Sequence, residues 1–379
     1  MDCPIRPLVD TLHDIPDPRH PRGRRHPLVA ILALMCVAML CGYRSYRAIA
    51  HGGRCYGQPL MRALGFTRAK TPCAATLYHV LRQLDSTLVE ASLGAWAESI
   101  LTALPPPPGE LEAMAIDGKT LRGSRKQGAP AAHLLSVLSH RLGLTLWQQA
   151  VADKTHEIPV LEEVLQGLVV EGRVITVDAL LTQRAIAQRI VAGGGDYVMV
   201  VKGNQPQLHQ DIHLLFQDTF AQAAPMVAAE TVDIGHGRIE QRRLTASTAL
   251  VGYHDWPGLA QVFQLERHVT LKASRAQRAD VVYGVTSLSP EQTGPERLLG
   301  LIRQHWQIEN QVHWVRDVTF EEDRSQVRGG SIPQVMAAFR NTAIGLMHWA
   351  GETNIAAACR RFAAQPWSAL ALIGITPDN

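Results

Sequence analysis

The apolar and polar positions divide the chain into a helical first part and a second part in which strands and helices alternate. Apolar side chains recur at helical spacing through residues 74–103, and the run "LPPPPG" at 104–109 cannot continue a helix. Beyond this run, short apolar stretches predict strands at "MAIDGK", "HLLSVLSH" and "LTLWQQAVAD". A helix, the strand "VITVDA", another helix and the strand "DYVMVVKG" follow, so the pattern predicts a mixed α/β sheet.

The later part of the chain changes pattern twice more. Residues 231–289 return to strand-like alternation, and helical spacing resumes from Pro295. A β-rich block is therefore expected to interrupt an α/β core.

Composition places the chain among ordinary soluble proteins of a reducing cytoplasm. The apolar run between Pro27 and Gly42 is shorter than the roughly 20 residues that cross a bilayer, so it predicts a buried helix. No two of the six cysteines form a CxxC pair, which favours neither a zinc site nor a disulfide framework. No export signal is expected.

Charge is distributed unevenly although the net charge is only +3. Residues 18–84 contain no Asp or Glu, which is unusual for a surface of mixed sign. The eleven cations of this stretch are Arg19, Arg22, Arg24, Arg25, Arg44, Arg47, Arg54, Arg62, Arg68, Lys70 and Arg82. A segment of this kind is typical of a polyanion-binding region, and a solvated basic face without a partner is the alternative.

Two aspartates stand where the pattern predicts the ends of buried strands. Asp117 follows the apolar residues 113–116, and Asp178 follows "VITV". If the first and fourth strands are neighbours, both carboxylates lie at one edge of the sheet, where a hard cation such as Mg²⁺ would offset their repulsion. The alternative for each aspartate is a turn residue that bonds its own backbone, and "DG" at 117–118 is a common turn dipeptide.

A third acid is expected on a helix packed against the sheet. In "ERLLGLIRQHWQIENQVHWVRDV", Glu309 lies at the centre of the more apolar stripe when residues are spaced at about 100° each. The residues that share this stripe are Leu298, Ile302, His305, Trp306, Val312, His313 and Arg316. The acids beyond it, Asp317, Glu321, Glu322 and Asp323, remain alternatives.

Motifs along nearly the whole chain resemble the DDE transposases of bacterial insertion sequences, in the group that includes the H-repeat-associated proteins. They are "DPRHPRGRRHPL", "AIDGKTLRGS", "DKTHEI", "TVDALLTQ", "GDYVMVVKGNQ", "GHGRIEQRR" and "IRQHWQIENQVHWVRDVTFEED". The resemblance implies catalytic acids at Asp117, Asp178 and Glu309. The chain departs from the superfamily's Tyr, Arg and Lys around the last acid, where it has Ile302, His305 and Arg316, and from the small residues after the second aspartate, where it has Leu180 and Leu181.

The resemblance also implies a ribonuclease-H-like mixed-sheet core with a β-rich insertion, preceded by a helical domain. We expect a basic helical DNA-binding domain at 1–104, the first part of the core at 105–230, the insertion at 231–289 and the helical remainder with the third acid at 290–379.

The implied reaction is cleavage of DNA at the ends of the element, followed by strand transfer. Two Mg²⁺ or Mn²⁺ ions per active site would be held by the three acids. The expected partner is double-stranded DNA, at the element's ends and at the target, bound by a homodimer or larger assembly at the bacterial nucleoid. The residues expected to contact DNA are Arg22, Arg24, Arg25, Arg44, Arg47, Lys119, Lys202, Arg238, His305 and Arg316.

Two other functions remain open at this point. A transposase-derived DNA-binding protein that no longer catalyses would be favoured by loss of an acid, and all three acids are present. A ribonuclease-H-like nuclease would cut DNA without joining it, and sequence does not separate these two activities.

Overall fold

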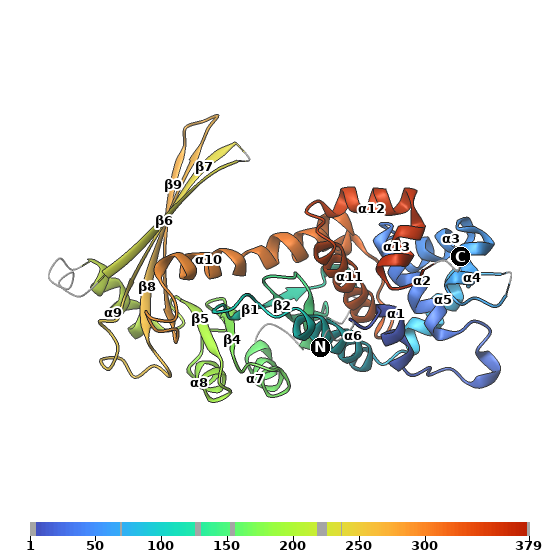
Figure 1. Cartoon of the computed structure of the whole chain (residues 1–379), viewed down its shortest axis with the longest axis horizontal. Helices are drawn as coiled ribbons and strands as arrows, with labels where there is room; N and C mark the ends of the chain where they lie inside the picture. The colour runs from blue at the N-terminus through green and yellow to red at the C-terminus, as the bar shows by residue number, and fades with distance from the viewer. Residues whose placement is uncertain are drawn as a thin grey trace. The chain divides into compact units, whose positions relative to one another are not determined.

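The computed structural model (Figure 1) describes residues 5–68, 70–125, 130–151, 156–217, 226–235 and 237–376. The chain forms two compact units, and each is assembled from separate segments. The first unit contains residues 1–108, 118–156 and 308–379, and the second contains residues 109–117 and 157–307.

The amino-terminal part of the first unit is helical, as the sequence predicts. Its helices are α1 (Leu8–Thr11), α2 (Leu28–Leu40), α3 (Tyr46–Cys55), α4 (Gly57–Ala63), α5 (Ala74–Gln83) and α6 (Ser86–Ala103). Helix α2 is buried at twelve of its thirteen positions, which confirms the predicted buried helix. Helix α6 begins where the Asp85 side chain accepts hydrogen bonds from the amides of Thr87 and Leu88. No helix in the described part of the chain is both long and apolar enough to span a membrane.

The rest of the first unit packs around one long helix, α11 (Ile332–Trp349), which contacts α2, α6 and strand β3. Strands β2 (His133–Ser139) and β3 (Thr145–Val151) pair antiparallel. The chain before α11 has two π-helical turns, Glu309–His313 and Val315–Thr319, and a 3₁₀ turn at Glu322–Arg324. The last elements are α12 (Ile355–Ala364) and α13 (Pro366–Leu372).

Parallel strands form the centre of the second unit. Strand β1 (Glu112–Thr120) pairs with β4 (Arg173–Val177), and β4 pairs with β5 (Asp196–Val201), both in parallel. The intervening helices are α7 (Glu157–Gly167) and α8 (Arg184–Ala192), and α9 (Pro206–Gln217) follows β5. Parallel neighbours require crossover connections of this kind, so the alternating helix and strand pattern is confirmed.

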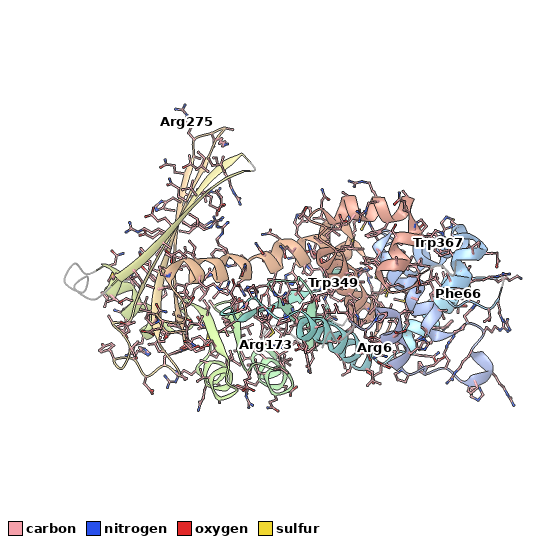
Figure 2. The ribbon with its side chains drawn as sticks, in the orientation of Figure 1. Arg6, Phe66, Arg173, Arg275, Trp349 and Trp367 are labelled. Carbon is pink, nitrogen blue, oxygen red and sulfur yellow. The ribbon has the colours of Figure 1, made fainter. Side chains whose placement is uncertain are left out.

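The β-rich block continues the same sheet through antiparallel strands. These are β6 (Met226–Gly235), β7 (Arg238–Ser247), β8 (Gln261–Leu271) and β9 (Gln277–Thr286), and β9 pairs with β5. The turn between β8 and β9 holds Arg275 in the left-handed region at φ 54°, and Figure 2 shows this residue at the tip of the hairpin. Strand order is β3-β2-β1-β4-β5-β9-β8-β7-β6. Helix α10 (Pro295–His305) packs on β6 and β7, and its Leu298 and Ile302 join Val174, Val198 and Leu265 in a buried core.

The sheet and the helical region before it confirm the predicted fold class, a mixed α/β core with a β-rich insertion. The four domains expected from the sequence, and the three boundaries between them, remain predictions.

Candidate active site

Asp117 and Asp178 lie at the same edge of the sheet, on neighbouring strands. The register pairs Ile116 with Val177, and each aspartate is the next residue of its own strand or turn. Because β1 and β4 run parallel, both carboxylates emerge at the same end. The first and fourth strands are therefore neighbours, which is the condition under which the sequence places the two aspartates together, and both aspartates are half-buried.

The backbone after β4 turns around Asp178. The amide of Leu181 donates to Asp178 Oδ1 at 3.1 Å, and the hydroxyl of Thr182 donates to the Asp178 carbonyl at 2.9 Å. The same hydroxyl donates to the Val200 carbonyl at 2.7 Å, which ties the turn to β5. Asp178 is thus a turn residue with one oxygen engaged, and its carboxylate is held in a fixed position.

Electrostatics at Asp178 favour a cation. Burial raises the pKa of the Asp178 carboxyl; the Leu181 amide and Lys202 offset part of this rise, and the nearby Glu157 adds to it. Glu157 opens α7 and is only 4% exposed. The two neighbouring acids repel each other, Asp178 half-buried and Glu157 buried, and both offer the carboxylate oxygens that a hard divalent ion such as Mg²⁺ prefers.

The sequence does not distinguish Glu157 from other acids that open helices. An acid in the first turn of a helix is ordinary, because it complements the helix dipole, so nothing in "DKTHEI" signalled its burial. Residues 152–155 of that motif lie outside the described residues. Among the residues that the structure describes, no three His, Cys, Asp or Glu side chains are grouped to hold a metal ion.

Glu309 lies in the first unit, at the start of the first π-helical turn, and its side chain is exposed. The predicted apolar stripe is correct for Leu298, His305 and Arg316, which are buried. It is wrong for Glu309, which is exposed. Helix α10 ends at His305, and π turns bond residues five apart, so the α-helical angle per residue no longer applies. Such turns occur frequently at functional sites.

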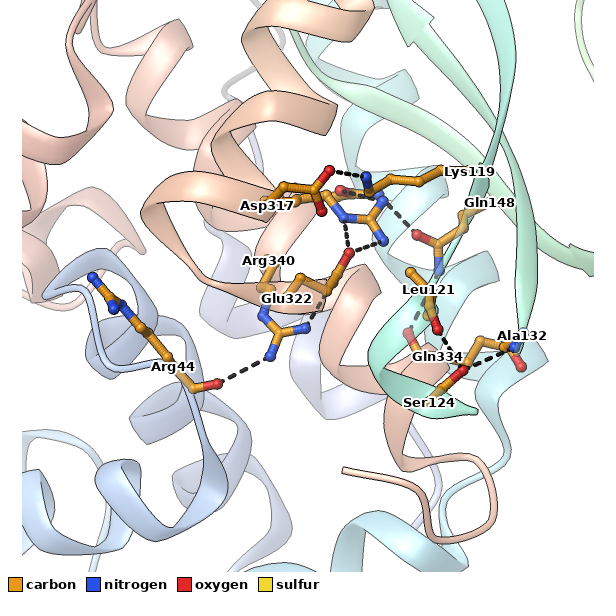
Figure 3. Close-up of polar contacts among 12 residues, drawn as sticks. Arg44, Lys119, Leu121, Ser124, Ala132, Gln148, Asp317, Glu322, Gln334 and Arg340 are labelled. Carbon is orange, nitrogen blue, oxygen red and sulfur yellow. Dashed lines mark hydrogen bonds and ion pairs between the residues drawn. The ribbon is translucent and has the colours of Figure 1, made fainter. Parts of the chain in front are cut away.

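The four alternative acids are all engaged by cations within the first unit, and Figure 3 shows the contacts of two of them, Asp317 and Glu322. Asp317 lies 2.6 Å from Lys119, and Glu322 lies 2.7 Å from Arg340. The remaining two pairs are Glu321 with Arg44 at 2.5 Å and Asp323 with Arg122 at 3.8 Å. Of the five acids between 309 and 323, Glu309 alone has no cationic partner among the described residues. This leaves its carboxylate the most available as a ligand.

Glu322 joins two buried arginines next to the π turns. Its Oε2 accepts from Arg316 Nε at 2.8 Å, and its Oε1 accepts from Arg340 Nη1 at 2.7 Å. Burial alone would raise the pKa of Glu322, but the two guanidinium groups outweigh it and hold the pKa below its usual range. Asn341 accepts from Arg316 and donates to Gln148, so the ion cluster is fixed to both α11 and β3.

Most of the cations expected to contact DNA are exposed. Arg22, Arg24, Arg25, Arg44 and Arg47 are exposed in the amino-terminal region. Lys202 and Arg238 are exposed in the second unit, where Arg238 also lies 3.3 Å from Glu240.

Three of the expected DNA contacts need correction, because their side chains are buried and paired. Lys119 is bound to Asp317, and Arg316 is bound to Glu322. His305 Nδ1 lies 2.9 Å from the Thr176 hydroxyl, and burial lowers the pKa of its ring to about 4. The His305 ring is therefore neutral at pH 7. None of the three presents a free charge to DNA in this structure.

Comparisons with known proteins show the family of this chain. The family described as "Transposase DDE domain" matches residues 108–346, and the "DDE_Tnp_1-associated" family matches residues 9–97. "Putative transposase YncI" of Escherichia coli O157:H7 is 29% identical over 350 residues, which cover 90% of this chain and 87% of that protein. "H repeat-associated putative transposase YhhI" of Escherichia coli K12 is 26% identical, with coverage of 90% of each chain.

A further relative, "Uncharacterized protein in dhlA 3'region" of Xanthobacter autotrophicus, is 35% identical over 66% of this chain and 85% of its own length. Among solved structures, a piggyBac transposase synaptic complex with hairpin DNA matches with a TM-score of 0.43 and 11% identity, over 93% of this chain and 76% of that chain. A likeness at this level supports no argument about function. The family matches and the relatives together identify the protein as a member of the DDE transposase family.

Proposed function

We propose that this transposase binds the terminal inverted repeats of an insertion sequence and catalyses metal-dependent cleavage and strand transfer of DNA. The catalytic acids are Asp117, Asp178 and Glu309. The observation that carries the proposal is the register of β1 and β4, which puts the two aspartates at one edge of the sheet.

The three acids would hold the metal ions. When bound, two Mg²⁺ or Mn²⁺ ions supply positive charge for the attacking and leaving oxygens of an in-line displacement. The strand backbones fix Asp117 and Asp178, and the Leu181 amide orients one oxygen of Asp178. Buried Glu157 adds negative potential at Asp178, which favours positive charge beside this carboxylate. The exposed position of Glu309 leaves its carboxylate accessible to a ligand.

The basic amino-terminal region would bind the DNA. The Asp- and Glu-free stretch at residues 18–84 presents Arg22, Arg25 and Arg47 to solvent. Each arginine placed on a phosphate releases condensed counterions, so affinity gained in this way depends on salt rather than on base sequence. Because two ends must be joined and each chain has one set of acids, two or more protomers would act together on paired ends.

A joining assay tests the proposal directly. The purified chain is incubated with DNA that carries the element's own ends, Mg²⁺ and a supercoiled target plasmid, and joined products are scored on a gel. The wild-type chain should yield them, Asp178→Asn should not, and Asp280→Asn, at an exposed position of β9, should match the wild type. Cutting without joining would instead support a nuclease, and DNA binding without cutting would support a protein that has lost catalysis.

A further inference from the structure

The first unit carries a cleft that the proposed acids do not occupy. Its volume is about 300 Å³, and its lining includes Arg44, Tyr46, Arg47, Glu321 and Arg324, together with polar and apolar neighbours. A second cavity of about 320 Å³ shares Tyr46, Gln326 and Val327 with the first and adds Tyr78 and Arg328. We call the two together the arginine cleft.

The charged residues that line the arginine cleft are mostly positive. Four arginines line it, at positions 44, 47, 324 and 328, and Glu321 is the acid among the lining residues. The side chain of Arg324 is 82% exposed, so its guanidinium is accessible from solvent. Positive charge gathered in a concave surface concentrates its field on an anion that enters.

Aromatic rings lie among these arginines. The rings of Tyr46 and Tyr78 have their centroids 5.8 Å apart at an interplanar angle of 51°, and both side chains are half-buried. A duplex offers phosphates, but its bases are stacked inside and need no aromatic partner. Arginines and tyrosines together in a groove are the combination that binds unpaired nucleotides, which offer both a phosphate and a free base face.

Glu321 occupies the arginine cleft in an unusual conformation. It has φ 49° and ψ 41°, a left-handed backbone that costs free energy for a residue other than glycine. Its carboxylate lies 2.5 Å from Arg44 and 3.9 Å from Arg324. The strained residue thus places an anion between two arginines, where a phosphate of DNA would otherwise bind.

We propose that the arginine cleft binds an unpaired nucleotide of the DNA end. The phosphate takes the place of the Glu321 carboxylate on Arg44 and Arg324, and the base stacks against Tyr46. This inference rests on the proposed function, because it takes DNA as the substrate, and it adds a site for a nucleotide outside the duplex.

The test compares two fluorescein-labelled DNAs of equal length, a blunt duplex and the same duplex ending in unpaired thymidines. Binding of the full chain is measured by anisotropy in buffer with EDTA. The wild-type chain should bind the frayed DNA about tenfold more tightly, the scale of one base stacked on an aromatic ring. Tyr46→Ala should remove this preference without changing the affinity for blunt duplex, and Tyr46→Phe should keep it.

A second variant is expected to bind frayed DNA more tightly, a result that misfolding would not produce. Glu321→Gly removes the competing carboxylate, and glycine adopts a positive φ at little cost, so frayed DNA should bind severalfold more tightly. Equal binding of both DNAs by the wild type, an equal loss for both DNAs in Tyr46→Ala, or weaker binding by Glu321→Gly would overturn the inference.

The experiment also separates this inference from the proposed function, since binding in EDTA does not require catalysis. A chain that joins DNA ends but shows no preference for frayed DNA would contradict the cleft assignment alone. A chain that shows the preference but never cuts DNA would contradict the catalytic proposal alone.

Discussion

Replacing Glu322 by glutamine should destabilise the first unit by about 3–5 kcal/mol, the usual cost of breaking a buried ion pair. The Glu322 side chain is 3% exposed, and its two partners, Arg316 and Arg340, are 0% and 2% exposed. Each carboxylate oxygen lies 2.7 or 2.8 Å from a guanidinium nitrogen. Glutamine keeps the volume and one acceptor oxygen, but it removes the anion.

The arrangement of charges determines this magnitude. One carboxylate compensates two buried guanidinium groups, so Glu322→Gln leaves two cations in a poorly solvated site. Arg316→Met leaves the pair of Glu322 and Arg340 intact and balanced, and it should therefore cost less than Glu322→Gln. The order of these two variants is a stricter test than either value alone.

Urea unfolding followed by tryptophan fluorescence at pH 7 measures the loss. The two units can unfold in separate transitions, so the comparison is made on the transition that shifts. Glu352→Gln is the matched control, because it removes the carboxylate from a much more exposed pair with Arg361. A Glu322→Gln midpoint no lower than that of the control would refute the reasoning, as would a larger loss in Arg316→Met.

Two other predictions concern charge. Burial lowers the pKa of His305 from 6.5 to about 4, so the folded state favours the neutral ring. The contribution of this residue to the stability of the folded state is fully present above pH 6.5 and is lost as the pH falls toward 4. The loss from this residue should be about 2 kcal/mol between pH 6.5 and 4.5, measured by urea unfolding, and an unchanged pH dependence in His305→Asn would contradict it. The affinity of the full chain for DNA should fall steeply as the salt concentration rises. Arg47 is exposed, and Arg47→Ala should reduce by about 1 the magnitude of the slope of log binding constant against log salt concentration. A slope unchanged from wild type would show that Arg47 does not contact DNA.

The sequence was sufficient for the strands, but it brings the two aspartates together only on a condition. Apolar runs mark β1 and β4 locally, whereas their pairing joins segments about 60 residues apart, so the shared edge of Asp117 and Asp178 follows only if the first and fourth strands are neighbours. The buried carboxylate that acts on Asp178 could not be predicted. Glu157 looks like an ordinary acid at the start of a helix, and its burial depends on what α7 packs against.

The segment around Glu309 could not be predicted from the sequence, because its geometry depends on distant contacts. The prediction of a shared buried face assumes about 100° per residue, as in an α-helix. Two π turns follow α10 instead, and Glu309 is exposed there. Arg316, Glu322 and Arg340 look like surface charges along the chain. Their burial as one cluster requires the fold to bring α11 against the π turns, and no local spacing contains that information.

The measurement that tests the central claim most directly compares strand transfer by Glu309→Gln and Asp323→Asn, under the joining conditions described above. Glu309→Gln should keep its DNA affinity but lose at least about 100-fold in the rate of joining, the scale of a misplaced catalytic group. Asp323→Asn should be milder, because Asp323 already has Arg122 as a partner. Normal joining by Glu309→Gln, with Asp317, Glu321, Glu322 or Asp323 indispensable instead, would contradict the account and move the third acid downstream.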